Sequence, residues 1–264
     1  EWRVSLQNPT ASYSAEEAVL TRLLASWLND SLNESLYPAW LAGQSFSAYP
    51  HSRGMTLSFS GWRDGQTPLI EQAIEQLKSA AITDGAFERV RYQLQREWRN
   101  APQSSLYGQA SRTLGEALLT PQWSTAELLA ASDRFDRHHL EDFRQRFLGG
   151  LYVDAMAVGN LDEALAREQA QLMRTQLRPR LTRDEIPNLT PLAADEAHAV
   201  LHPHSSREES LVLRYLQARD QTLEEQATTS VIAQWLDTPF YQQLRTEQQL
   251  GYIVNAGYSP LLEA

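Results

Sequence analysis

Residues 14–32, SAEEAVLTRLLASWLNDSL, and the two short alternating segments that follow them indicate the fold class. Ser14, with Glu17 three positions later, forms a capping-box pattern, which predicts that a helix begins there. Its apolar residues recur every three or four positions, as on one face of an amphipathic helix: Val19, Leu20, Leu23, Leu24, Trp27, Leu28 and Leu32. This helix should pack one face on a sheet.

Two runs with period-2 alternation come next, at residues 45–49 and 55–60. The connection HSRG at 51–54 ends in Gly54, which can take a positive φ, so the pair predicts a β-hairpin. A helix followed by an antiparallel hairpin indicates the α+β class, with helices packed on an antiparallel sheet.

Helices and strands continue to alternate along the rest of the chain. Further helical stripes reach about residue 148, a strand is expected at 151–158, and a helix runs from about 160 to 177. Beyond residue 191 we expect strands at 197–201 and 210–216, one helix over about 222–236 and a second from Pro239, and a strand from Gly251.

Residues 178–191 have no periodic pattern and contain Pro179, Pro187 and Pro191, which predicts an extended linker. The predicted organisation is an α+β unit at residues 1–180, a linker at 181–194, and the beginning of a second α+β unit at 195–264. The second unit has only about 70 residues, too few to close a comparable core, so we expect it to be truncated.

Composition excludes several classes of function. Hydrophobic residues make up 42% and charged residues 21% of the chain, which is ordinary globular usage. The net charge is −10 and no dense basic stretch is present, so nucleic acid is not an expected partner. No run of apolar residues is long enough to span a membrane. The chain has no cysteine, hence neither disulfides nor thiolate metal ligands.

Histidines suggest metal sites, but none is convincing. The segment His138-His139-Leu140-Glu141-Asp142 approaches the inverted zinc motif His-x-x-Glu-His, with Asp142 in place of the second histidine. A charged helix face is the commoner reading of such a segment. His198, His202 and His204 form a looser group that Pro203 keeps extended, so we interpret them as a surface turn. No metal site is therefore predicted in this chain.

The stretch PFYQQLRTEQQLGYIV, residues 239–254, holds the most informative polar residues. Arg245 and Tyr252 lie on either side of a predicted helix end. Two such donors could converge on a developing oxyanion. A surface arginine and a packed tyrosine are the alternative reading.

The stretch from Leu244 to Tyr252 resembles the Leu-Arg-Thr…Gln-Leu-Gly-Tyr signature in the C-terminal half of the pitrilysin/insulinase family of zinc metallopeptidases. Other motifs occur in the family's order along nearly the whole chain: Leu28-Asn29-Asp30-Ser31-Leu32-Asn33-Glu34, Tyr37-Pro38-Ala39, Leu41-Ala42-Gly43, Gly61-Trp62 and Val158-Gly159-Asn160-Leu161. The sequence departs from the family signature at Glu247-Gln248-Gln249, because a lysine is expected beside the glutamate. Both donor residues, Arg245 and Tyr252, are present.

The resemblance implies four homologous α+β domains that enclose peptide substrates in a chamber, this chain being most of the third domain and the start of the fourth. Zinc and its ligands would belong to the N-terminal catalytic half, the partner of this one. Arg245 and Tyr252 would donate hydrogen bonds to the substrate carbonyl at the scissile bond. Because the chain lacks His-x-x-Glu-His, it should be inactive alone and bind no cofactor.

The resemblance leaves two points open. A non-enzymatic scaffold or assembly subunit with the same fold is the alternative function, and a His-x-x-Glu-His upstream in the full-length protein would favour the peptidase. The expected compartment is the periplasm, with the cytoplasm as the alternative.

Overall fold

The computed structural model describes residues 1–191, 208–218, 220 and 222–259. These residues divide into two compact units. The first holds residues 1–191 and 208–211, and the second holds the described residues from Val212 onwards. No helix among the described residues has the length and apolar character needed to cross a bilayer.

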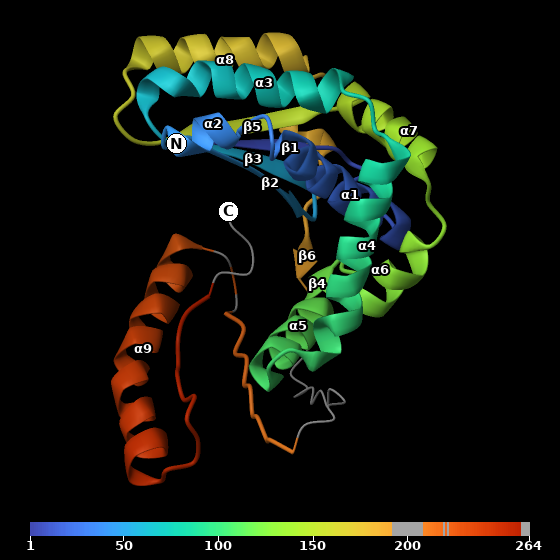
Figure 1. Cartoon of the computed structure of the whole chain (residues 1–264). Helices are drawn as coiled ribbons and strands as arrows, with labels where there is room; N and C mark the ends of the chain where they lie inside the picture. The colour runs from blue at the N-terminus through green and yellow to red at the C-terminus, as the bar shows by residue number, and fades with distance from the viewer. Residues whose placement is uncertain (192–207, 219, 221, 260–264) are drawn as a thin grey trace. The chain divides into compact units, whose positions relative to one another are not determined.

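An antiparallel sheet is the centre of the first unit (Figure 1). Its strand order is β2-β3-β1-β5, with bounds Ser45–His51, Gly54–Ser60, Trp2–Gln7 and Tyr152–Ala157. Gly54 begins β3 with a φ of +152°, and a Cβ there would collide with the carbonyl oxygen of Leu6. The predicted hairpin and the predicted strand at 151–158 are confirmed.

Helices cover one face of this sheet, with α3 and α8 side by side along it (Figure 1). The helices of the first unit are α1 (Ala15–Leu32), α2 (Tyr37–Leu41), α3 (Gln66–Ser79), α4 (Asp84–Asn100), α5 (Leu106–Leu118), α6 (Thr125–Ser132), α7 (Arg137–Gly149) and α8 (Glu163–Leu177). Short 3-10 turns lie at Arg63–Gly65, Ala101–Gln103 and Arg183–Glu185, and a two-stranded ladder joins β4 (Leu119–Thr120) to β6 (Thr190–Pro191).

The predicted start of α1 is confirmed, because the Ser14 hydroxyl accepts a hydrogen bond from the Glu17 N–H at 3.2 Å. The helix then buries its apolar stripe against the sheet and its neighbours. Trp27 of α1, Leu57 and Phe59 of β3, and Leu6 of β1 are all buried in one continuous core. The α+β fold with an antiparallel sheet packed by helices is thus confirmed.

A buried hydrogen-bond chain ties the central strand to both covering helices. The Trp2 indole N–H donates to the Gln169 side-chain oxygen at 2.7 Å, and the Gln169 amide donates to the Thr67 hydroxyl at 2.9 Å. Gln169 is fully buried on α8. Its amide therefore satisfies the buried Trp2 N–H and the half-buried Thr67 hydroxyl.

Replacing Gln169 by leucine should lower the free energy of unfolding by about 1 to 3 kcal/mol, because the Trp2 N–H and the Thr67 hydroxyl lose their partner. Urea denaturation would measure the change. Gln171→Leu on the exposed face of the same helix is the matched control and should change stability little. Equal stability of the two variants would contradict the role given to this chain of bonds.

The edge strand β2 is protected along its outer side. Asn29 of α1 donates to the Ala48 carbonyl at 2.7 Å and accepts from the Ala48 N–H at 2.8 Å. Pro50 has no N–H to offer a further strand. Asn29 thus satisfies backbone groups that would otherwise pair with another chain.

Within the described part of the first unit, no helix lies over the second face of the sheet (Figure 1). Its residues are mostly small and hydroxylic, and they alternate with the buried ones along each strand. Those that are exposed or half-buried are Arg3, Ser5, Ser45, Ser47, Tyr49, His51, Ser58, Ser60, Tyr152, Asp154 and Met156.

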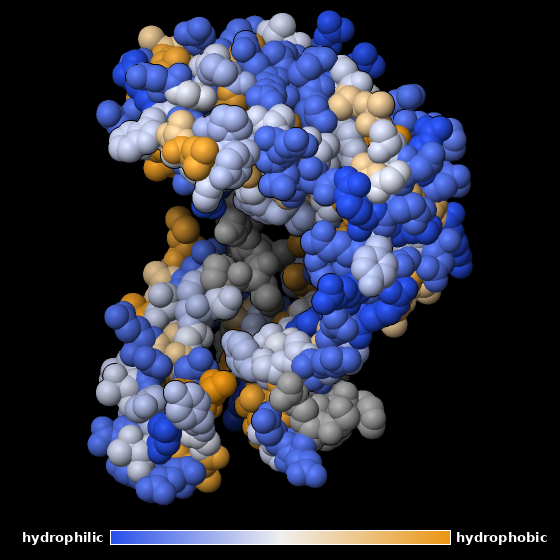
Figure 2. Space-filling view, viewed as in Figure 1, coloured by the Kyte–Doolittle hydropathy of each residue, from blue (hydrophilic) through white to orange (hydrophobic). Residues whose placement is uncertain are grey.

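The second unit contains one long helix, α9 (Leu223–Tyr241), which continues into π-helical turns at Gln242–Glu247. No residue of α9 is buried, and its large hydrophobic side chains remain at the surface: Leu223, Val231, Ile232, Trp235, Leu236, Phe240 and Tyr241. Figure 2 shows hydrophobic residues on the surface of this unit.

Three predictions for this unit are wrong. Residues 222–236 and those from Pro239 form one helix rather than two, with Pro239 inside it. The described parts of the expected strands at 210–216 and from Gly251 are irregular. Strands need partners for their backbone groups, and no described segment of this unit supplies a sheet. The strand expected at 197–201 lies outside the described residues.

Candidate functional site

The end of α9 forms a wide reversal that positions the two predicted donor residues. The helix widens into i to i−5 bonding, and the Gln248 N–H donates to the Gln243 carbonyl at 3.0 Å. Gln249 takes a left-handed φ of +52°, and the Leu250 N–H then donates to the Leu244 carbonyl at 3.0 Å. This arrangement satisfies helix-end carbonyls and turns the chain back.

The reversal brings Arg245 and Tyr252 together. The guanidinium carbon of Arg245 lies 5.4 Å from the centre of the Tyr252 ring, a cation–π contact. The Tyr252 side chain is 86% exposed. Neither side chain has a hydrogen-bond partner among the described residues. Their N–H and O–H groups are therefore able to donate to an acceptor that approaches from solvent.

The segment after Tyr252 runs back beside α9. The Ala256 N–H donates to the Asp237 carboxylate at 3.4 Å. Burial raises the pKa of Tyr215, and Tyr258 acts in the same direction. The Arg245–Tyr252 pair thus lies at the turn between α9 and the irregular segment that follows it.

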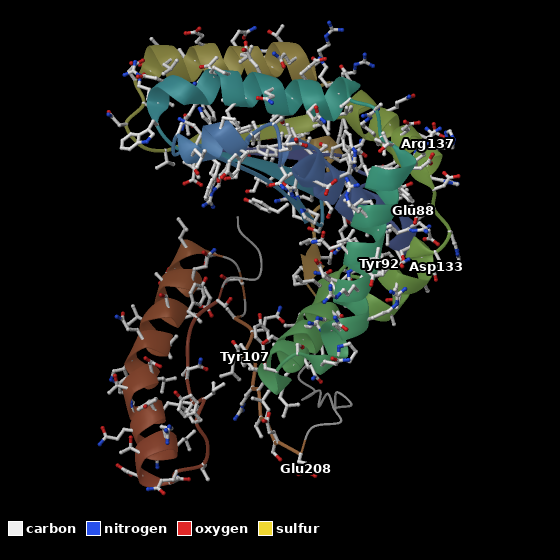
Figure 3. The ribbon with its side chains drawn as sticks, viewed as in Figure 1. Glu88, Tyr92, Tyr107, Asp133, Arg137 and Glu208 are labelled. Atoms are coloured by element: carbon white, nitrogen blue, oxygen red, sulfur yellow. The ribbon has the colours of Figure 1, made fainter. Side chains whose placement is uncertain are left out.

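The two histidines of α7 contact carboxylates that lie three residues away in sequence. The His138 ring lies 3.8 Å from the Glu141 carboxylate, which also pairs with Arg137 at 3.3 Å (Arg137 is labelled in Figure 3). The His139 ring contacts the Asp136 carboxylate at 2.6 Å. In the part of the chain that the structure describes, no three His, Asp or Glu side chains are placed to hold a metal ion. His198, His202 and His204 lie outside the described residues.

Sequence reasoning missed a polar pair on the sheet, Ser5 and His51. The Arg53 N–H donates to Nδ1 of His51 at 3.2 Å, so Nε2 carries the proton and donates to the Ser5 hydroxyl at 3.1 Å. The ring therefore cannot accept the hydroxyl proton, and the pair is not a nucleophile with its base. Burial lowers the pKa of His51 to about 4, and the positive charge of Arg53 acts in the same direction. The two residues are far apart in sequence, and only strand pairing joins them.

His51 should make the fold sensitive to acid. Its pKa is about 4 in the fold against an ordinary 6.5, so between these values the unfolded chain binds more protons. The free energy of unfolding should therefore fall as the pH drops from 6.5 toward 4, by about 2 to 3 kcal/mol for this half-buried ring. Urea titrations at several pH values would measure it. His51→Gln should remove this component, whereas His138→Gln on the exposed face of α7 should keep it; an unchanged pH profile in His51→Gln would contradict the assignment.

Two family models match the chain. Residues 1–131 match the middle or third domain of peptidase M16. Residues 231–264, which contain Arg245 and Tyr252, match domain 4 of the C-terminal lobe of the PQQ synthase PqqF-like proteins. The two matches occur in the order of the two units.

Curated relatives match nearly the whole chain. The insulin-degrading enzyme of Drosophila melanogaster is 26% identical over 96% of this chain and 26% of its own length. The protein mug138 of Schizosaccharomyces pombe, named as a candidate zinc protease, is 26% identical over 95% of this chain and 26% of its own length. The chain thus spans about a quarter of the length of these relatives.

A solved structure shares the fold. The crystal structure of pitrilysin aligns with a TM-score of 0.72 at 21% identity, over 96% of this chain and 27% of the pitrilysin chain. The two family models, the relatives and this common fold agree with the motifs quoted above. The chain belongs to the pitrilysin/insulinase family of zinc metallopeptidases.

Proposed function

We propose that this chain is part of the substrate-enclosing half of a zinc-dependent endopeptidase and contributes hydrogen-bond donors to the cleavage site without holding the metal. The observation that carries the proposal is the pairing of Arg245 and Tyr252 at 5.4 Å in the segment that matches the fourth domain. Within this proposal, residues 1–180 are the third domain, 181–194 the linker and 195–264 the start of the fourth.

The two donors have a definite chemical task. A peptide carbonyl oxygen gains negative charge when the carbon is attacked, and donors already in place stabilise that charge more than they stabilise the ground state. Arg245 supplies a permanent positive charge and Tyr252 a neutral O–H. Their ring-face contact holds the guanidinium beside the phenol, so both donors approach one acceptor from neighbouring directions.

The uncovered face of the sheet suits an enclosing wall. Its serines, including Ser45, Ser47 and Ser58, are small and carry both a donor and an acceptor. Such a surface can contact peptides of many sequences. Zinc would require ligands that the described residues do not assemble, so no catalytic step is assigned to a metal in this chain.

Metal content and turnover test the proposal together. The purified chain, reconstituted with zinc at neutral pH, should bind no stoichiometric zinc and should not cleave a quenched fluorescent peptide. Addition of the N-terminal half in trans should restore cleavage. Zinc-dependent cleavage by the chain alone would overturn the assignment. Failure of the full-length protein to cleave any peptide, with no His-x-x-Glu-His upstream, would favour the scaffold function.

A further inference from the structure

Four large side chains form an exposed patch at one end of the sheet in the first unit. Tyr37, Trp40 and Leu41 belong to α2, and Trp62 follows β3. Their exposed fractions are 56%, 63%, 65% and 74%. We call these four residues the aromatic patch. Figure 1 shows α2 near the N-terminus of the chain. Three of the four are aromatic. Isolated exposed hydrophobic side chains are common, but a group of large ones marks an interaction site.

The patch is held in place by its surroundings. The Trp62 indole lies against Gly43, where a Cβ would come within 2.7 Å of its Nε1 atom, and Gly43 has a φ of +80°. The Gly43 N–H donates to the Trp40 carbonyl at 2.9 Å, which joins Trp62 to the end of α2. The Gln44 amide donates to the Trp62 carbonyl at 2.7 Å. The Tyr37 and Trp40 rings stack with centres 5.8 Å apart.

Two carboxylates lie close to the patch residues in sequence. Glu34 lies three residues before Tyr37, and Asp64 lies two after Trp62; neither makes an ion pair with another described residue. Arg63, which lies between Trp62 and Asp64 in sequence, forms an ion pair with Asp162 at 2.6 Å. The whole chain carries a net charge of −10, which attracts cations over longer distances. Aromatic faces also attract cations through their quadrupole.

We propose that the aromatic patch binds lysine or arginine side chains of a peptide, with Trp40 and Trp62 as cation–π surfaces and with Glu34 and Asp64 as counter-charges. The inference rests on the proposed function, because the bound peptide would be a substrate held away from the scissile bond. The inference adds to the proposed function a preference for basic peptides as substrates. The aromatic rings are already fixed before a peptide binds, which lowers the conformational entropy that is lost on binding.

The test uses the full chain and short amidated Lys/Gly peptides, which need no cleavage to be scored. Binding should be seen by calorimetry at low salt and should shift the indole NMR signals of Trp40 and Trp62. The same peptide with acetylated lysines should bind at least about tenfold more weakly. Trp40→Ala and Trp62→Ala should each weaken binding about three- to tenfold. Glu34→Gln with Asp64→Asn should reduce the salt dependence.

Two exposed aromatic residues outside the patch provide controls. Tyr92 on α4, labelled in Figure 3, and Trp235 on α9 are 63% and 76% exposed. Tyr92→Ala and Trp235→Ala should leave peptide binding unchanged. Affinity that is unaltered in Trp40→Ala and Trp62→Ala, or equal for acetylated peptides, would overturn the inference.

The remaining outcomes separate this inference from the proposed function. Self-association that Trp40→Ala abolishes would assign the patch to a second copy of the chain and overturn the inference. Peptide cleavage by the full-length protein, without any patch-dependent binding of basic peptides, would overturn the inference and leave the proposed function intact. Loss of peptide cleavage on Arg245→Ala, with normal binding at the patch, would support both.

Discussion

Replacing Arg245 by alanine in the full-length protein should lower kcat for peptide cleavage by about one to three orders of magnitude, because the transition state loses one of its hydrogen-bond donors. The guanidinium is the charged member of the pair, and it lies over the Tyr252 ring without a carboxylate partner among the described residues. Tyr252→Phe should cause a loss in the same range, because it deletes only the O–H. Steady-state kinetics on a quenched fluorescent peptide would measure both.

Zinc content and a matched arginine variant separate this role from damage to the fold. Both variants should retain the zinc content of the wild-type protein, because neither residue is expected to be a ligand. Arg214→Ala removes an exposed arginine from the same unit and should leave kcat unchanged. If Arg245→Ala and Tyr252→Phe both turn over substrate at the wild-type rate, the assigned role is wrong.

Trp27→Ala should lower the free energy of unfolding by about 3 to 5 kcal/mol, the usual cost of emptying a large aromatic site in a core. The indole is almost fully buried on α1. The Arg144 guanidinium lies 5.4 Å from its ring centre and also donates to the Ala80 carbonyl. Removal of the ring therefore creates a cavity and leaves a partly buried cation without its aromatic neighbour.

Urea denaturation monitored by circular dichroism would measure this loss. Trp235→Ala removes the same side chain from an exposed position on α9 and should change stability little. A Trp27→Ala variant as stable as Trp235→Ala would show that the core described here does not carry the stability of the first unit.

Local signals predicted the first unit well. The Ser14 cap depends on residues three positions apart, and the glycine at position 54 is required by a single turn. Both features could therefore be recognised without tertiary information. The motif around Asn29 was recognised only as a resemblance. The structure supplies its physical reason, because Asn29 covers the backbone of Ala48 on the edge strand.

The second unit shows where such reasoning stops. Alternation at 210–216 and apolar residues after Gly251 indicate strand propensity, but a strand forms only when another segment satisfies its backbone groups. The described residues around both stretches hold no partner strand. Pro239 also did not end the helix, because the chain continued into wider π-type turns instead.

Residues close together in the chain encode caps, turns and motifs, so the α+β class, the family and the two donor candidates could be identified without coordinates. The three-dimensional arrangement was needed to show that Arg245 lies over Tyr252, that His51 donates to Ser5, and that Trp62 rests on Gly43. Each of these contacts depends on how a turn, a strand register or a loop places distant atoms within a few ångströms. The residue types alone do not specify these distances.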